Sequence, residues 1–124
     1  MPLIEFPYTL HRGYRVPIIP ISIYSHKIWV FVDSGATFSL LAVDEAKRIG
    51  INWESGRRQM IVVGDGSYIP TFIHELPLQI GDSQINAPVG FSERLGVGFN
   101  LLGRTGVLNP FEVCFNDHTR TLSF

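Results

Sequence analysis

The run from Ile28 to Val32 is apolar and rich in β-branched residues, and it ends abruptly in Asp33-Ser34-Gly35. Such a run predicts a buried strand, so the sequence places a carboxylate at the end of that strand. A buried carboxylate loses hydration and is therefore paired, hydrogen-bonded, metal-bound or protonated. Ser34 offers a hydroxyl, and Gly35 lets backbone N–H groups approach the carboxylate. Asp33 is a candidate catalytic acid or base, although an ordinary turn after a strand has the same residues.

A second segment, Phe99 to Leu108, carries the apolar pair Leu101-Leu102 followed by Gly103 and Arg104. Taken with Phe31 to Ala36, its order and spacing resemble the retropepsin-like aspartic proteases. That family combines an Asp-Thr/Ser-Gly loop with an apolar-apolar-Gly element ahead of a short helix. The resemblance covers most of the chain and implies the retropepsin fold.

The bulk composition fits one folded domain spanning residues 1–124, since the chain has 124 residues and 45% of them are hydrophobic. Ten basic and eleven acidic residues give a net charge of -1, which offers no footprint for nucleic acid or an anionic membrane. Cys114 is the only cysteine and is expected to be a packed strand residue. The N-terminus lacks a signal-peptide pattern and no apolar run is long enough to span a bilayer, so we expect a cytoplasmic protein.

Short strands dominate the expected secondary structure. The one convincing helix is Leu41 to Ile49, stopped by Gly50. Pro17 and Pro20 indicate an edge strand. The predicted strands are Val16–Tyr24, Lys27–Val32, Arg57–Val63, Ser67–His74, Leu76–Ile80, Gln84–Phe91, Asn100–Leu102, Phe111–Asn116 and Arg120–Phe124. We therefore expect an all-β, closed, barrel-like domain with one or two short helices.

The resemblance implies a homodimer in which Asp33 meets its copy from the partner and the pair hydrolyses peptide bonds. Ser34 would brace the two loops across the axis, and Gly35 would keep its amide close to the carboxylates. Ala36 supplies no hydroxyl where some relatives carry Ser or Thr. We expect the dimer to form through interleaved termini, Leu3 to Tyr8 and Arg120 to Phe124.

The hairpin tip Gly64-Asp65-Gly66-Ser67 corresponds in order to the family's flap, a mobile hairpin that closes over bound peptide. Its glycines suit a close backbone approach to substrate, although a plain surface turn predicts the same residues. Tyr68 is either an aromatic wall of the site or a solvent-facing strand residue.

Leu102, Gly103 and Arg104 are expected to support the site. In many viral-type relatives this Arg pairs with an Asp four residues after the catalytic one. Here that position is Thr37. The usual partner of Arg104 is therefore missing.

Other chemistries have little support, and no metal or other cofactor is expected. The four histidines share no ligand spacing, and Ser34 lacks the nucleophile-elbow pattern. Two non-enzymatic readings remain open: a catalytically silent retropepsin-like dimer that acts as a peptide-binding or assembly module, and a monomeric β-barrel binding domain.

Overall fold

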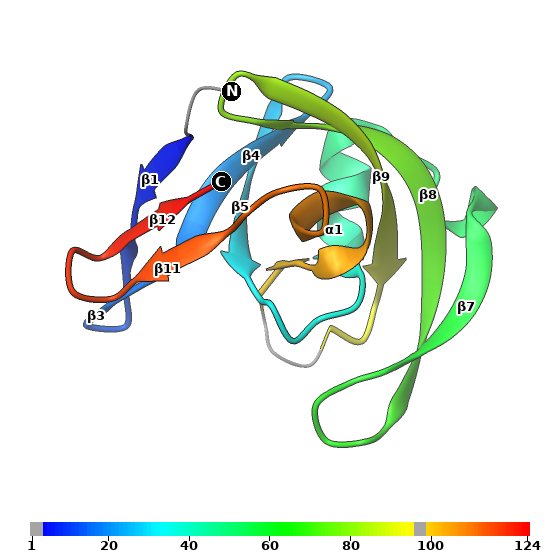
Figure 1. Ribbon diagram of the computed structural model, residues 1–124. Helices are drawn as coiled ribbons and strands as arrows, with labels where there is room; N and C mark the ends of the chain where they lie inside the picture. The colour runs from blue at the N-terminus through cyan, green and yellow to red at the C-terminus, as the bar shows by residue number, and fades with distance from the viewer. Residues whose placement is uncertain (1–3, 96–98) are drawn as a thin grey trace.

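The structure is a computed structural model that describes residues 4–95 and 99–124 (Figure 1). It consists mostly of β-strands with a few short helical segments, as predicted. The strands are β1 (Glu5–Pro7), β2 (Thr9–His11), β3 (Tyr14–Val16), β4 (Ile18–Ile23), β5 (His26–Val32), β6 (Ser39–Ala42), β7 (Arg57–Val62), β8 (Tyr68–Ile80), β9 (Ser83–Ser92), β10 (Leu101–Leu102), β11 (Cys114–Asn116) and β12 (Thr121–Ser123). The helical segments are α1 (Val43–Ile49), the short 3-10 turn η1 (Trp53–Ser55) and the kinked η2 (Arg104–Leu108).

The main sheet has seven strands in the order β4-β5-β10-β6-β9-β8-β7. Alternation along β5 decides which face is buried: Ile28, Val30 and Val32 are at most 2% exposed, whereas Lys27 and Trp29 face outward. Each fully buried side chain of this size contributes roughly 1.5–3 kcal/mol. The inward face meets α1 and the ends of the chain in one hydrophobic core. The strand that carries Asp33 is therefore anchored along its whole length.

The predicted barrel closure is wrong. The sheet curls until β4 returns to β8, but these two strands meet at a single residue pair, Ser22 opposite Gln79. A barrel requires a continuous ladder between its first and last strands. β7 pairs with residues 68–73 of β8, and farther along this strand Gln79 is the one residue that pairs with β4. The β7–β8 hairpin instead projects away from the body of the molecule (Figure 1).

Several element boundaries differ from those predicted. Leu41 and Ala42 end strand β6, so the helix begins at Val43; its C-terminal stop at Gly50 is confirmed, with a left-handed φ of 82°. The two expected strands Ser67–His74 and Leu76–Ile80 are one strand, because β8 changes its main partner from β7 to β9 along its length. No helix within the described ranges has both the length and the apolar content that crossing a membrane requires.

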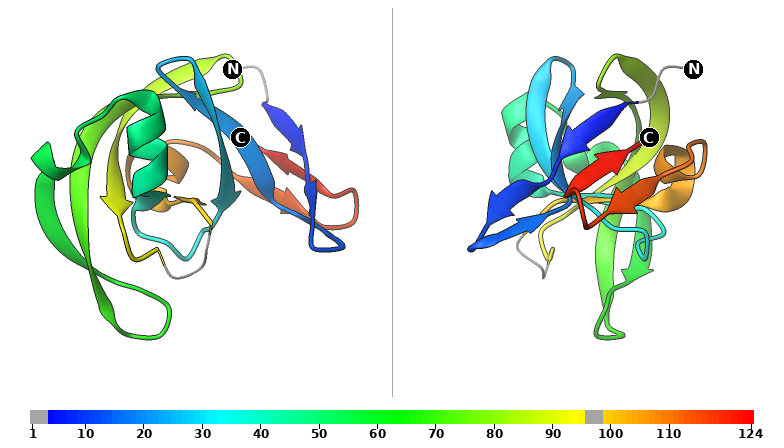
Figure 2. Two further views of the ribbon diagram at one scale, coloured as in Figure 1. Left: turned by 180° about the vertical axis from the view of Figure 1, so that it is seen from behind. Right: turned by 60° about the vertical axis from the view of Figure 1, so that its left-hand side comes forward.

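The first and last strands, β1 and β12, lie side by side (Figure 2). β1 pairs antiparallel with β12 of the same chain, and β11 pairs with the other edge of β12. The buried Tyr8 hydroxyl donates to Asp117 at 2.7 Å, and burial is the main reason why the pKa of Tyr8 rises to about 12. Pairing of the two ends within the chain leaves the expectation that they also contact a partner as a prediction. Leu3, the first residue of that predicted contact, lies outside the described residues.

Candidate active site

Asp33 follows the last residue of β5 and is half-buried. β5 runs parallel to β10, with Phe31 opposite Leu101 and Val32 opposite Leu102. The backbone N–H of Asp33 continues this pairing by donating to the Leu102 carbonyl at 3.0 Å. The predicted position of the carboxylate, at the end of a buried strand, is confirmed.

Residues 33–37, which we call the Asp33 loop, form a tight turn around the carboxylate. The Gly35 N–H donates to Asp33 Oδ1 at 2.9 Å, and the Ala36 N–H donates to the Asp33 carbonyl at 3.1 Å. A Cβ on Gly35 would lie 3.2 Å from Oδ1, so a larger residue would push the carboxylate. The hydrogen bond from Gly35 fixes the orientation of the Asp33 carboxylate.

The second sequence motif, at Arg104 and Thr105, is hydrogen-bonded to the Asp33 loop through its backbone. The Arg104 N–H donates to the Ala36 carbonyl at 2.9 Å, and the Thr105 N–H donates to the Thr37 carbonyl at 2.8 Å. The Gly103 N–H donates to the buried hydroxyl of Ser39 at 2.9 Å. The chain passes so closely here that a Cβ on Gly103 would collide with the carbonyl of Phe38.

We expect Gly103→Ala to destabilise the fold by about 1–3 kcal/mol, because the added methyl group must displace backbone atoms and not a flexible side chain. Gly64→Ala is the matched control, since a Cβ at Gly64 meets nothing within 4 Å. Denaturant unfolding of both variants measures the difference. Equal stabilities of the two variants would show that the backbone around Phe38 moves aside at little cost in free energy.

Arg104 supports the loop through its backbone. Its side chain is exposed, and within the described residues the only ion pair joins Arg48 to Glu45. Leu102 and Val107 are fully buried in the core, whereas Leu101 is half-buried.

The predicted hairpin around Gly64-Asp65-Gly66 is present between β7 and β8. The pairing of these strands runs from Val62 opposite Tyr68 to Arg57 opposite Ile73. Gly66 has a φ of 85°, a conformation that favours glycine, and its N–H donates to the Val63 carbonyl at 2.9 Å. We call residues 63–67 the flap turn. Tyr68 is 64% exposed and does not line the cavity described below.

Asp65 stabilises the flap turn from its side chain. Its Oδ1 accepts the Ser67 hydroxyl at 2.6 Å and the Ser67 N–H at 2.9 Å. These hydrogen bonds hold the pKa of Asp65 below its usual value, the side-chain bond being the larger cause. The stabilisation is present at neutral pH and is lost only as the pH falls through the lowered pKa. The Asp65 carboxylate therefore stays ionised in mildly acidic solution.

A cavity of about 820 Å³ lies between the Asp33 loop and the flap turn. We call it the Asp33 cavity. Its walls are mostly apolar side chains from both sides of the opening, with Asp33 and Asp65 as the acids among the described lining residues. The lining includes Gly35, Ala36, Thr37, Phe38, Leu40, Met60, Ile61, Val62, Gly64, Ser67, Ile69, Arg94, Leu95 and Leu101. The geometry brings together the two segments that the sequence singled out seventy residues apart and adds the hairpin between them.

Two residues near this site were missed by the sequence analysis. Arg94 lines the Asp33 cavity although it follows β9 in a turn that has no recognisable motif. Asn100, directly before β10, makes three side-chain hydrogen bonds to distant parts of the chain. The only local signal for Asn100 is a polar residue at the start of an apolar pair.

Comparisons with known proteins agree with this arrangement. The sequence model of a family described as aspartyl protease matches residues 19–105. Among solved structures, a retropepsin-like aspartic protease from Rickettsia conorii is similar with a TM-score of 0.73 and 20% identity, covering 97% of this chain and 98% of that chain. The EIAV protease, complexed with the inhibitor HBY-793, is similar with a TM-score of 0.59 and 19% identity, covering 77% of this chain and 88% of that one. The comparison with curated proteins gave no match.

Proposed function

The chain belongs to the aspartyl protease family, and we propose that it is an aspartic endopeptidase that works as a homodimer on extended peptides. The observation that carries this proposal is the Asp33 loop, fixed on a buried strand and opening into a cavity that the flap turn borders on the other side. We also propose that residues 1–124 form one domain of this kind and that catalysis needs no cofactor.

Peptide hydrolysis by carboxylates requires two of them, one ionised and one protonated. The other acid among the described residues of the Asp33 cavity, Asp65, belongs to the flap turn and is occupied by Ser67. A two-fold axis beside the Asp33 loop would place Asp33 opposite its copy in a second chain. The exposed Ser34, Gly35 and Thr37 support this assembly, because they present the outer face of the loop for contact.

In the proposed reaction the ionised Asp33 takes a proton from a water molecule while the other carboxyl, which is protonated, gives its proton to the oxygen of the scissile carbonyl. The water oxygen bonds to the carbonyl carbon and gives a tetrahedral diol. The carbon–nitrogen bond then breaks: the carboxyl that took the proton of water gives it to the leaving nitrogen, and a hydroxyl of the diol returns a proton to the other carboxylate. Two carboxylates that face each other across the axis share one proton, so one is ionised and acts as the base while the other is protonated and acts as the acid.

The remaining residues of the Asp33 loop have positioning roles in this proposal. Ser34 would hydrogen-bond across the two-fold axis, and Gly35 would hold the carboxylate through its N–H while leaving room for substrate. The flap turn would close over the peptide and exclude water, with Gly66 permitting the turn conformation.

The Asp33 cavity also indicates which peptides fit. Its apolar walls favour apolar side chains on either side of the scissile bond. Arg94 is the only cation among the described residues that line it. The backbone of Arg94 is anchored, because its N–H donates to Ser92 Oγ at 3.1 Å and that hydroxyl donates to the Pro70 carbonyl at 3.0 Å. We propose that one subsite accepts an acidic side chain opposite Arg94.

Peptides that carry Glu at that subsite should be cleaved about fivefold faster than the same peptides with Gln, the upper range for a solvent-exposed ion pair. Arg94→Gln should remove the preference and leave cleavage of the Gln peptides unchanged. Arg58→Gln is the matched control, because Arg58 is an exposed arginine on β7 that does not line the cavity. A preference for Glu that survives Arg94→Gln would assign it to another residue.

The general proposal is tested by incubating the purified chain with a mixed peptide library and identifying the products by mass spectrometry. Internal cleavage between apolar residues is expected. A peptide mimic with a secondary hydroxyl at the scissile position should inhibit, since it places its hydroxyl between the two carboxylates. If a folded and dimeric preparation releases no product, the proposed endopeptidase activity is wrong.

A further inference from the structure

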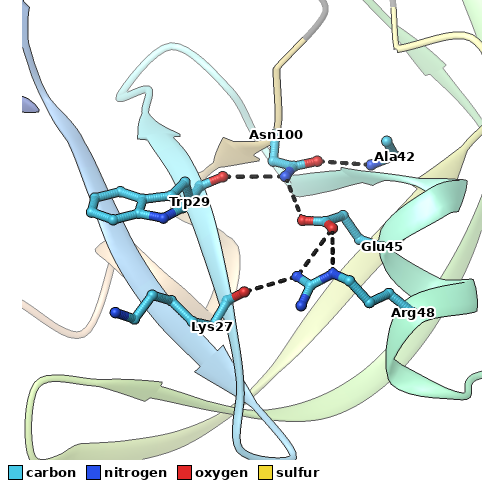
Figure 3. A network of polar contacts seen from close by, with 6 residues as sticks. All are labelled: Lys27, Trp29, Ala42, Glu45, Arg48 and Asn100. Carbon is cyan, nitrogen blue, oxygen red and sulfur yellow. Dashed lines mark hydrogen bonds and ion pairs between the residues drawn. The ribbon is translucent and has the colours of Figure 1, made fainter. Parts of the chain in front are cut away.

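Asn100 joins three elements through its side chain (Figure 3). Its Oδ1 accepts the Ala42 N–H at 2.9 Å, where β6 meets α1. Its Nδ2 donates to the Trp29 carbonyl of β5 at 3.2 Å and to Glu45 Oε2 of α1 at 3.1 Å. The backbone carbonyl of Asn100 also accepts the Phe31 N–H at 2.8 Å. The residue therefore fixes the start of β10 against both neighbouring strands and the helix.

The network continues from Glu45 to Arg48 and back to β5. Glu45 Oε1 accepts Arg48 Nε at 3.1 Å, and Arg48 Nη2 donates to the Lys27 carbonyl at 2.8 Å (Figure 3). Glu45 is thus held by a cation on one side and by the amide of Asn100 on the other. An ordered carboxylate is a fixed acceptor, so it holds the Asn100 amide in one orientation.

Only an amide satisfies all the partners of position 100. Ala42 presents a donor, whereas Trp29 and Glu45 present acceptors. Asn carries one acceptor and two donors, which matches this set. An aspartate at this position would keep the bond to Ala42, lose both donated bonds and place a second negative charge beside Glu45.

The network is connected to Asp33 through the backbone of Leu101 and Leu102. β10 consists of Leu101 and Leu102 alone, and such a short strand has few ladder bonds with which to fix its own position. The Leu102 carbonyl accepts the N–H of Asp33. Any shift of β10 along β5 therefore moves the backbone that carries the carboxylate.

Asn100 does not touch the space where substrate would bind. Asn100 and Glu45 line a separate cavity of about 590 Å³, which shares only Leu95 with the Asp33 cavity among the described residues. We propose that Asn100, held by Glu45 and Arg48, is a positioning residue that sets the place of Asp33 through β10. The inference rests on the proposed function where its readout is catalysis.

Asn100→Asp is the direct test. We expect kcat for peptide cleavage to fall about fivefold with little change in KM, because the substrate cavity is intact and the carboxylate is displaced. The limbs of the pH–rate profile should also move, since the pKa values of a carboxylate pair depend on the distance between the two groups. Asn86→Asp is the matched control, an exposed asparagine on β9 undergoing the same chemical change. Where Asn100→Asp folds poorly, Asn100→Ala removes the contacts without adding a charge.

Rescue distinguishes positioning from general damage. Adding Glu45→Gln to Asn100→Asp removes the repulsion and supplies an amide donor at position 45, which can bond the new carboxylate while its oxygen still accepts from Arg48. The double variant should recover most of the lost kcat, whereas Glu45→Gln alone should also lower it, because its single oxygen cannot accept from both Arg48 and Asn100. A double variant that stays as slow as Asn100→Asp would overturn the proposal.

Hydrogen exchange provides a readout that does not require catalysis. The amide of Asp33, which donates to Leu102, should exchange about fivefold faster in Asn100→Asp and recover in the double variant. If the wild-type chain cleaves peptides but neither kcat nor this exchange rate changes in Asn100→Asp, the inference is wrong. If the wild-type chain cleaves nothing, the proposed function fails, and the exchange rates alone decide whether Asn100 positions Asp33.

Discussion

Asp33→Asn is expected to abolish peptide cleavage and to leave the fold intact. The amide has the shape of the carboxylate and still offers an oxygen to the Gly35 N–H, so the turn has no reason to change. It cannot take a proton from water, however, and it cannot share one with the opposite carboxylate. A positioned general base contributes on the order of 10²–10⁴-fold, so the remaining rate should lie at or below the detection limit.

The measurement compares both proteins from about pH 3 to about pH 8, a span that includes both titrations expected of a carboxylate pair. The wild-type rate should be bell-shaped with its maximum in mildly acidic solution, since Ala36 adds no hydroxyl to stabilise the ionised pair. Asp82→Asn, an exposed turn residue, is the control. Equal rates for wild type and Asp33→Asn would end the protease hypothesis. Peptide binding without cleavage by either protein would favour the silent binding module.

Local sequence signals predicted the parts of the site that depend on local conformation. The apolar run before Asp33, the glycines of the flap turn and the stop at Gly50 each describe a few consecutive residues, and the structure contains all three. The turn between β4 and β5 was misplaced by one residue, because Tyr24 and Ser25 adopt positive φ angles that their side chains do not favour. Tertiary pairing of the two strands overrides that local preference.

The features that were missed depend on pairs distant in the chain. Pairing of β1 with β12 joins residues at opposite ends of the chain, and although a strand was predicted over Arg120–Phe124, nothing local identifies β1 as its partner. The hairpin of β2 and β3 turns through Arg12 and Gly13, both with positive φ, and only the glycine was a signal. The bonds of Asn100 to Ala42 and Trp29 likewise span more than fifty residues. Periodicity and turn chemistry contain no information about such partners.

The β7–β8 hairpin is the part of the sheet that reaches the candidate site. β7 pairs with residues 68–73 of β8, and the hairpin of these two strands projects beyond the rest of the sheet (Figure 1). This projection places the flap turn at the border of the Asp33 cavity, across from the Asp33 loop.

Excess Asp33→Asn protein is expected to silence the wild-type protein in a mixture. If each active site takes one Asp33 from each of two chains, a mixed dimer contains a single carboxylate and cannot act as acid and base together. Random pairing at a twentyfold excess leaves about one wild-type chain in twenty with a wild-type partner. The wild-type rate should fall by the same factor, the second largest effect that we expect.

The rate is measured after the two proteins have had time to exchange subunits, with substrate far above KM so that binding of peptide by the variant removes little of it. Mixing immediately before the assay is the control, and there the wild-type rate should be nearly unchanged. A complete site within one chain predicts no inhibition at any ratio or incubation time. Inhibition that develops with incubation would instead require that each active site takes one Asp33 carboxylate from each of two chains.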